Sequence, residues 1–128
     1  MYILNKKFQG KVIRGDGLGR KLGYPTANLN WPPKKRIPKG VFAVRVRVLK
    51  KNYPGVAVIG IPTVTDKKPK LEIHILDFDK MIYCQWLSAE IIKKIRNLKT
   101  YRSKKELIKM IHNDCRKAKK ILINSAKQ

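Results

Sequence analysis

The sequence predicts a mainly β domain, a small antiparallel barrel or sandwich of about six strands closed by one C-terminal helix. Two observations lead to this class. Between residues 8 and 87 the chain is a series of short runs that alternate apolar and polar residues, separated by turn-like stretches rich in proline, glycine and lysine. From residue 103 onward, apolar residues instead recur every three or four positions, which is the period of a helix. With no internal repeat and no linker, residues 1–128 are expected to form a single domain.

The first half of the chain contains the clearest strand. Residues 8–14 are expected to be a short strand leading into a glycine-rich loop, and Pro25 favours an extended chain after that loop. Residues 30–40 contain three prolines and are expected to be a loop. Alternation begins at Val41, with Phe42, Val44, Val46 and Val48 on one face and Ala43, Arg45 and Arg47 on the other.

The second half is expected to add strands over residues 56–61, 71–78 and 81–87. The turns and connections between them are expected at residues 50–54, 63–69 and 77–80. In the middle strand of these three, Glu72 and His74 alternate with apolar residues and therefore project from the same face. Tyr83, Trp86 and Tyr101 could border a flat ring system, but aromatic residues of a small barrel are usually core residues, and we favour the core.

The final segment is predicted to be one amphipathic helix. Ser103 and Glu106 have the spacing of a capping box, which marks a helix start. The apolar positions that follow are Leu107, Ile108, Ile111, Cys115, Ala118 and Leu122. This stripe is expected to lie on the barrel and close the domain.

The chain is strongly basic, with 31 Lys and Arg against 8 Asp and Glu and a formal net charge of +23. Such a field attracts polyanions without identifying one. Because the basic residues are spread along the chain, we interpret most of them as solvated surface. Barrels that bind oligonucleotides interleave exposed aromatic residues with basic ones, and the strand face with Arg45 and Arg47 carries no aromatic residue. We therefore expect no specific nucleic-acid partner.

Cysteine usage and the lack of long apolar runs indicate where in the cell the protein is expected. Cys84 and Cys115 are far apart and belong to no Cys-x-x-Cys pair, which argues against a disulfide framework or a zinc site. The amino terminus is too short in apolar residues for a signal peptide, and no apolar run is long enough to span a membrane. We predict a soluble cytoplasmic protein that is a monomer and has no membrane partner.

The stretch from Gly15 to Asn28, Gly-Asp-Gly-Leu-Gly-Arg-Lys-Leu-Gly-Tyr-Pro-Thr-Ala-Asn, carries the candidate chemistry. Its four glycines let backbone N–H groups approach a phosphate, and Arg20 adds positive charge. Thr26 and Asn28 are expected to share one face of the extended segment, where a hydroxyl and an amide oxygen suit a hard ion such as Mg²⁺. The loop matches neither a Walker nor a dinucleotide-binding motif. Taken alone, its composition also fits a flexible solvated turn.

Together these features resemble the riboflavin kinase (flavokinase) family. The most specific parts of the likeness are Leu22-Gly-Tyr-Pro-Thr-Ala-Asn28 and, later in the chain, Glu72-Ile-His-Ile75. Further matching positions are Gly10-Lys-Val12, Pro38-Lys-Gly-Val-Phe42, Gly60-Ile-Pro-Thr63, Asp77-Phe78, Tyr83, Lys94-Ile-Arg96, Ser103, Leu107 and Asp114. The likeness implies a six-stranded Greek-key barrel that transfers the γ-phosphoryl group of ATP to the 5′-hydroxyl of riboflavin, giving FMN and ADP.

The resemblance also implies residue roles. Glu72 matches the carboxylate that orients and deprotonates the hydroxyl, and Arg96 matches a segment near the flavin. Thr26 and Asn28 match the positions that hold Mg²⁺ or another divalent ion against the phosphates of ATP. The implied ATP-binding positions are Gly15, Gly19, Arg20, Gly23, Pro25, Thr26 and Asn28.

Other interpretations of these residues stay open. Glu72 also fits a surface glutamate paired with a lysine, and Arg96 fits plain surface charge. His74 could support Glu72, although we favour a structural hydrogen bond. Cys84 stands where the family usually has glycine, and Tyr101 where it usually has phenylalanine.

The competing functions are a basic nucleic-acid-binding barrel and a retired kinase domain that only binds flavin. Intact Thr26, Asn28 and Glu72 argue against retirement. Many bacterial relatives also carry an adenylyltransferase domain that forms FAD, and this chain resembles their kinase half alone.

Overall fold

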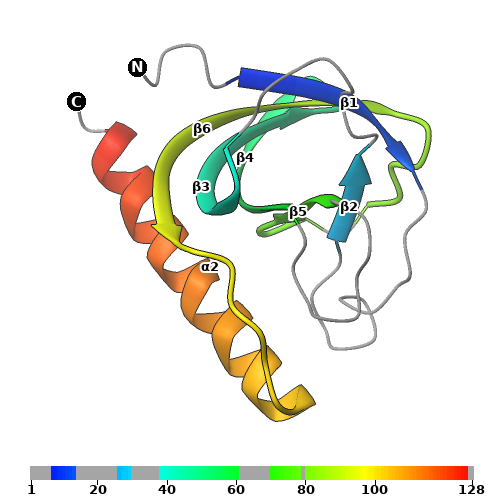
Figure 1. Ribbon diagram of the computed structural model, residues 1–128. Helices are drawn as coiled ribbons and strands as arrows, with labels where there is room; N and C mark the ends of the chain where they lie inside the picture. The colour runs from blue at the N-terminus through cyan, green and yellow to red at the C-terminus, as the bar shows by residue number, and fades with distance from the viewer. Residues whose placement is uncertain (1–6, 14–25, 30–37, 61–69, 79, 127–128) are drawn as a thin grey trace.

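The structure is a computed structural model that describes residues 7–13, 26–29, 38–60, 70–78 and 80–126. The elements in these ranges are β1 (Lys7–Ile13), β2 (Thr26–Leu29), β3 (Gly40–Val48), β4 (Lys51–Gly60), β5 (Lys70–Ile75), β6 (Trp86–Arg96) and α2 (Lys104–Ala126), drawn in Figure 1.

The strands pair antiparallel and close into a barrel in the order β1-β2-β5-β4-β3-β6. Strands β3 and β4 are a hairpin, whereas β2 pairs with β5 although that whole hairpin lies between them in sequence. In this order β6 is three strands from β5 in either direction, so the two strands lie in opposite walls. The predicted six-stranded antiparallel barrel with a C-terminal helix is confirmed.

The alternation predicted after Val41 decides which side of β3 faces the core. Arg45 and Arg47 point outward, whereas the apolar residues that alternate with them are buried inside the barrel. The interior is filled by Phe8, Val12, Leu29, Phe42, Val44, Val46, Val48, Ile59, Leu71, Ile73 and Leu87. Removing this apolar surface from water supplies most of the driving force for closing the barrel.

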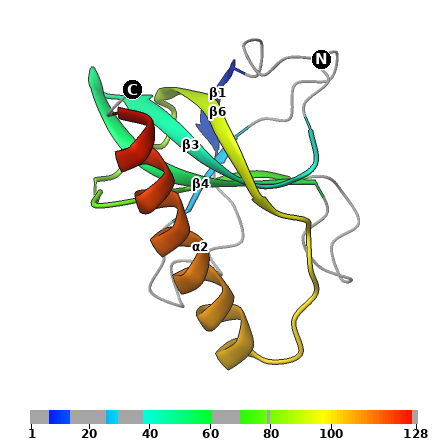
Figure 2. The same ribbon diagram turned by 90° about the vertical axis from the view of Figure 1, so that its left-hand side faces the viewer.

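Helix α2 packs on the outer side of β3, β4 and β6, as Figures 1 and 2 show from two directions. It begins at the predicted capping box: the Glu106 N–H donates to Ser103 Oγ at 3.2 Å, and Glu106 Oε2 accepts from the Arg102 N–H at 3.1 Å. These contacts pair backbone donors that the first helical turn leaves unsatisfied.

The apolar stripe of α2 forms a second core with the outer side of the barrel. It includes Leu107, Ile111, Cys115 and Ala118, which meet Val41, Ala43 and Val56. Ile108, predicted to belong to the stripe, is instead exposed. Burial, with the charge of Asp114 beside it, raises the pKa of the Cys115 thiol to about 11, so this cysteine packs as a neutral side chain at physiological pH.

The boundaries of β4 differ from the prediction. Residues 50–54 were expected to turn, but the turn consists of Leu49 and Lys50, and β4 begins directly afterwards. Both turn residues have positive φ, 52° and 65°. Two-residue hairpin turns of this kind usually contain glycine or asparagine, so neither residue signals the turn in the sequence.

Pro54 lies within β4, opposite Arg45 of β3. Its carbonyl accepts a hydrogen bond from the Leu76 N–H at 2.9 Å, directly after β5 ends. The N–H that proline lacks would face the same side, beyond the last pair of the β4–β5 ladder. Proline therefore costs the β3–β4 ladder no hydrogen bond, and its missing N–H leaves the pair with Leu76 half made where the β4–β5 ladder ends at Gly55.

The last strand also differs from the prediction. Residues 81–87 were expected to form it, but residues 81–85 contain a turn, with Cys84 at φ 67°, and β6 begins at Trp86. Pairing between β3 and β6 has two register shifts, which interrupt the alternation of β6 beyond Ile91. Arg96 is the last residue of β6.

Trp86 is 65% exposed and Tyr83 is 40% exposed, so the prediction that both are core residues is wrong.

A charged hydrogen-bonded pair ties α2 to the end of β6. Arg96 donates from Nε to Asp114 Oδ1 at 2.9 Å and from Nη2 to Oδ2 at 2.8 Å. The side chain of Asp114 is 5% exposed and that of Arg96 is 24% exposed. Removing the carboxylate charge would leave a largely buried guanidinium without its counter-ion. We expect Asp114→Asn to lower the free energy of unfolding by about 2 kcal/mol, measured by urea denaturation.

Asp77→Asn is the matched control for this prediction. Asp77 accepts a hydrogen bond from Lys119 Nζ at 3.2 Å, but its side chain is 69% exposed. An exposed pair of this kind contributes little, so the control should change the stability by less than about 0.5 kcal/mol. Equal losses in the two variants would contradict a special role for the Arg96–Asp114 pair.

Candidate active site

Four polar side chains meet on the outer face of the β2–β5 pair. Asn28 is directly opposite Glu72, and Thr26 is directly opposite His74. Side chains of opposed residues in antiparallel strands share a face, with Cβ atoms about 5 Å apart. The residues between them in sequence, such as Ala27 and Ile73, face the barrel core. We call Thr26, Asn28, Glu72 and His74 the β2–β5 quartet.

His74 is the most buried member of the quartet, at 6% exposure. A hydrogen bond of 2.9 Å joins its Nδ1 to Thr26 Oγ1. If the ring carries its proton on Nε2, the Thr26 hydroxyl donates to Nδ1, and the oxygen lone pairs of Thr26 then face away from the ring. The favoured interpretation of His74 as a hydrogen-bonding residue is correct, with Thr26 as a partner.

Glu72 is partly buried, with a side chain that is 20% exposed. One of its carboxylate oxygens, Oε1, lies 3.9 Å from Lys70 Nζ, two residues away on the same face of β5. The lysine pairing considered from the sequence is therefore present. A contact at this distance in a partly solvated position holds a carboxylate only weakly. Glu72 thus lies opposite Asn28, with the ammonium group of Lys70 nearby.

The predicted phosphate-binding positions Gly15, Gly19, Arg20, Gly23 and Pro25 lie outside the described residues. Strand β2 begins at Thr26, the residue that directly follows the glycine-rich stretch in sequence.

Arg96 is not on the β2–β5 pair. It ends β6, in the opposite wall, and its guanidinium bonds to Asp114 and, through Nη1, to the Asn97 carbonyl at 3.1 Å. The interpretation of Arg96 as plain surface charge is therefore incomplete, since it fixes α2. Its predicted place near a flavin stays a prediction.

The pairing of β2 with β5 is the part of this site that sequence reasoning missed. Each strand had its polar residues assigned to the correct face, but nothing in either strand predicts which strand lies next to it. The only available signal was that Thr26–Asn28 and Glu72–His74 have the same spacing of two residues, which lets both pairs align in register.

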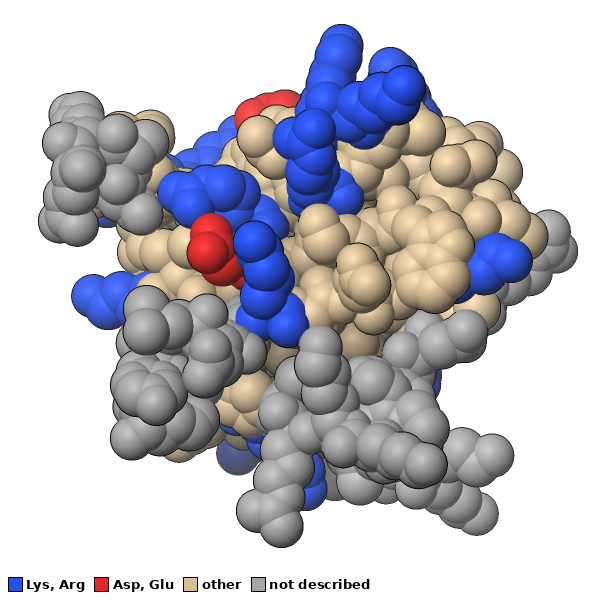
Figure 3. All heavy atoms as spheres, turned by 90° about the horizontal axis from the view of Figure 1, so that it is seen from above, with Lys and Arg blue, Asp and Glu red and all other residues tan. Residues whose placement is uncertain are grey.

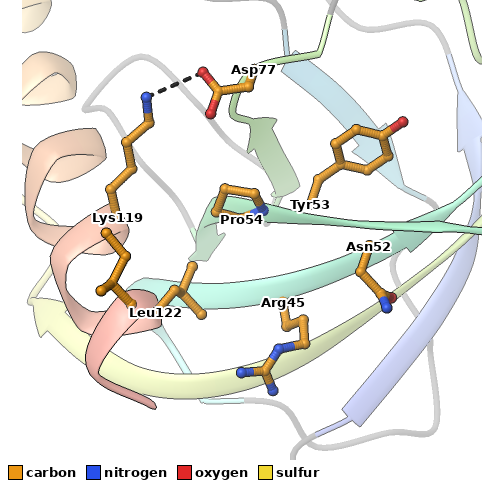
Figure 4. Close-up of a pocket in the computed structure, with 8 residues that line it drawn as sticks. Arg45, Asn52, Tyr53, Pro54, Asp77, Lys119 and Leu122 are labelled. Atoms are coloured by element: carbon orange, nitrogen blue, oxygen red, sulfur yellow. Dashed lines mark hydrogen bonds and ion pairs between the residues drawn. The ribbon is translucent and has the colours of Figure 1, made fainter. Parts of the chain in front are cut away.

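A cavity of about 380 Å³ lies elsewhere, between the C-terminal half of α2 and the β3–β4 hairpin. Figure 4 shows its lining residues, which are Arg45, Asn52, Tyr53, Pro54, Asp77, Lys119, Leu122 and Ile123. No member of the β2–β5 quartet lines this cavity. Its charged residues are already paired, Lys119 with Asp77 and Arg45 with Glu90, so we do not place the chemistry there.

The quartet offers oxygen ligands but no complete metal site of its own. Among the described residues, no group of three or more His, Cys, Asp and Glu side chains is placed to hold a metal ion. The hydroxyl of Thr26, the amide of Asn28 and the carboxylate of Glu72 are hard oxygen donors, and Mg²⁺ usually takes its remaining ligands from water and substrate phosphates. The donor set therefore fits an ion that arrives with a nucleotide.

In the described part of the chain, no helix is long and apolar enough to cross a membrane.

Comparison with known proteins gives a family match and similar curated proteins. The family model described as Flavokinase: Riboflavin kinase matches residues 4–122. The bifunctional riboflavin kinase/FMN adenylyltransferase of Escherichia coli K12 is 42% identical over 109 residues, which are 82% of this chain and 34% of that protein. The protein of the same name from Haemophilus influenzae is 38% identical, over 91% of this chain and 39% of that protein. The chain thus spans little more than a third of these relatives.

Two solved structures are also similar. A structure described as a macrolide-efflux protein from Streptococcus pneumoniae matches 84% of this chain and 36% of its own, with a TM-score of 0.76 and 29% identity. A riboflavin kinase from Trypanosoma brucei matches 91% of this chain and 78% of its own, with a TM-score of 0.63 and 22% identity. The second likeness is one of fold.

Proposed function

The chain belongs to the riboflavin kinase family, and from this premise we propose that it transfers the γ-phosphoryl group of ATP to the 5′-hydroxyl of riboflavin, giving FMN and ADP. The observation that supports this most is the register of β2 and β5. It sets a carboxylate, an amide and a hydroxyl side by side on one face. Phosphoryl transfer mainly requires positioned reactants and neutralised charge, together with a group that takes the proton of the acceptor hydroxyl.

Glu72 is proposed as the general base. The 5′-oxygen of riboflavin forms a bond to the γ-phosphorus as its proton passes to the Glu72 carboxylate, and the bond from the γ-phosphorus to the β,γ-bridging oxygen breaks to release ADP. Glu72 is suited to this because it is 20% exposed, which is enough to meet a substrate without full solvation.

Thr26 and Asn28 are proposed to hold Mg²⁺ through their side-chain oxygens, together with the phosphates of ATP. When bound, Mg²⁺ neutralises phosphate charge. His74 is proposed to orient Thr26, with Nδ1 accepting the 2.9 Å hydrogen bond that the hydroxyl donates, so that the oxygen lone pairs face outward. Asn28 is fixed by its place opposite Glu72 in the ladder.

The remaining roles follow from the family. Gly15, Gly19, Arg20, Gly23 and Pro25 are proposed to contact the phosphates of ATP. Arg96 is proposed to border the flavin, with Asp114 holding its guanidinium in place.

We further propose that residues 1–128 act as one kinase domain, as a monomer in the cytoplasm. All members of the quartet come from one chain, which supports catalysis by a single copy.

The experiment that tests this function follows ADP release in the presence of ATP and Mg²⁺. Riboflavin should stimulate the release, and FMN should accumulate in equal amount. Lumiflavin, which has the same ring system but no ribityl hydroxyl, is the matched control and should give no stimulation. ADP release that is independent of riboflavin, or equal with lumiflavin, would contradict the proposal.

The hydrogen bond between His74 and Thr26 gives a separate prediction. His74→Leu removes the acceptor and should lower kcat/KM for ATP by about tenfold, whereas His74→Asn can restore a polar atom near the Nδ1 position and should recover most of the loss. In a Thr26→Val background, His74→Leu should cost little further activity, because the two residues act through one contact. Additive losses in this double-mutant cycle would mean that His74 acts independently of Thr26.

A further inference from the structure

The outer face of β1, β6 and β3 is a second polar surface of the barrel. Its outward residues align across the three strands in rows, which are Lys7–Glu90–Arg45, Gln9–Ser88–Arg47 and Lys11–Trp86. We call these eight residues the basic sheet face. In the strand order β6 is three strands from β5, but β1 pairs with β2, so the face adjoins the β2–β5 quartet at its β1 edge, where Ile13, two residues after Lys11, is opposite Asn28.

The charge of the basic sheet face is mostly positive. It holds four basic residues and one acid, Glu90. Glu90 stands between Lys7 and Arg45, and its Oε1 accepts a hydrogen bond from Arg45 Nη1 at 3.0 Å. Figure 3 looks onto this side of the barrel and shows Lys and Arg side chains projecting around a stretch of uncharged surface, with few acidic residues. The face therefore attracts anions.

The face also carries an aromatic ring that the sequence analysis did not place there. Trp86 is 65% exposed and lies directly opposite Lys11. The outward face of β3, which carries Arg45 and Arg47, has no aromatic residue, and for this reason the sequence argued against a nucleic-acid surface. The adjacent strand β6 supplies the ring on the same face, with Ser88 and Arg47 in the next row.

We propose that the basic sheet face binds single-stranded nucleic acid without sequence specificity, in addition to the proposed kinase activity. Surfaces of this kind combine basic side chains for phosphates with aromatic rings on which bases stack. Same-face positions are about 6.8 Å apart along a strand, and neighbouring strands are about 4.8 Å apart. A single strand crossing the face can thus stack a base on Trp86 while its phosphates meet Lys11 and Arg47.

The chemistry of the face favours nucleic acid over a lipid surface. A membrane-binding patch buries a continuous apolar area in the headgroup region. Here Lys11 and Ser88 are neighbours of Trp86 on the face, with Gln9 and Arg47 beyond. The exposed apolar residue Ile13 follows Lys11 on the same side of β1, so charged side chains interrupt the apolar area.

The test is fluorescence anisotropy of the whole chain with labelled oligouridylate and oligothymidylate at several salt concentrations. A logarithmic plot of affinity against salt should have a slope of about −2 to −3, as expected for three to four phosphate contacts on a single strand. Trp86→Ala should weaken binding about tenfold without changing this slope, and Trp86→Phe should keep most of the affinity. The double variant Lys11→Gln/Arg47→Gln should weaken binding and make the slope shallower by about 1.4.

The matched control is Lys105→Gln/Lys109→Gln, which removes the same charge from exposed positions of α2. It should leave the affinity within about twofold. Equal losses in the two double variants, or no loss in Trp86→Ala, would overturn the proposal and mean that the net charge of the chain binds polyanions diffusely. Trp86-dependent binding to phosphatidylserine vesicles or to an acidic protein, without binding to either oligonucleotide, would also overturn it. Thermal unfolding of each variant shows whether its fold is retained.

Discussion

Glu72→Gln is expected to lower kcat for FMN formation by about 1,000-fold, the range that general-base catalysis contributes, while riboflavin affinity changes by less than about threefold. Glutamine keeps the size and shape of the side chain, but its amide cannot take up the proton of the 5′-hydroxyl. The substitution therefore isolates proton transfer from binding. Steady-state FMN formation gives kcat, and quenching of riboflavin fluorescence gives the affinity.

Glu90→Gln is the matched control for this result. Glu90 is also a strand glutamate with a basic partner, since Arg45 lies 3.0 Å from its Oε1, but it belongs to β6 in the opposite wall. Its replacement should leave kcat within about twofold, because it lies far from the reacting atoms in the proposed site. Near-normal turnover in Glu72→Gln would show that another group takes the proton.

Asn28→Ala is expected to lower kcat/KM for ATP by about 100-fold and to raise the Mg²⁺ concentration that gives half-maximal rate by about tenfold. The variant removes the amide oxygen opposite Glu72 and leaves the backbone pairing of β2 and β5 intact, because the ladder uses main-chain groups. Rates measured over a Mg²⁺ titration at fixed ATP separate the loss of metal affinity from the loss of turnover.

The control for the second prediction is Asn52→Ala. Asn52 is an exposed strand asparagine of β4, opposite Arg47, whose Nη1 donates to its Oδ1 at 3.4 Å. Its removal should leave both the rate and the Mg²⁺ dependence unchanged. A Mg²⁺ dependence of Asn28→Ala that matches the wild type would exclude Asn28 as a metal ligand.

Strand faces could be predicted from the sequence where alternation is uninterrupted. Val44 and Val46 of β3 were placed on one face, and Ile73 on the apolar face of β5, from period-two patterns, and all three are buried. Boundaries failed where geometry depends on backbone conformations that carry no residue signal. The turn at Leu49 and Lys50 uses positive φ without glycine or asparagine.

Residues that act together from different strands were harder to predict than faces. Glu72 and His74 were placed on one face, and Thr26 and Asn28 on another, but the ladder that joins them depends on the closure of the whole barrel. Trp86 failed for a different reason. The strand was predicted to end at Leu87, which hid the alternation of Trp86, Ser88 and Glu90 with the buried residues of β6.

The decisive measurement is the identity of the product when the chain is incubated with riboflavin, Mg²⁺ and ATP labelled in the γ-phosphate. We expect the label to appear on the 5′-oxygen of riboflavin as FMN, in equal amount to the ADP released. Label found only in inorganic phosphate, or no consumption of ATP while riboflavin is bound, would contradict riboflavin kinase activity in this chain.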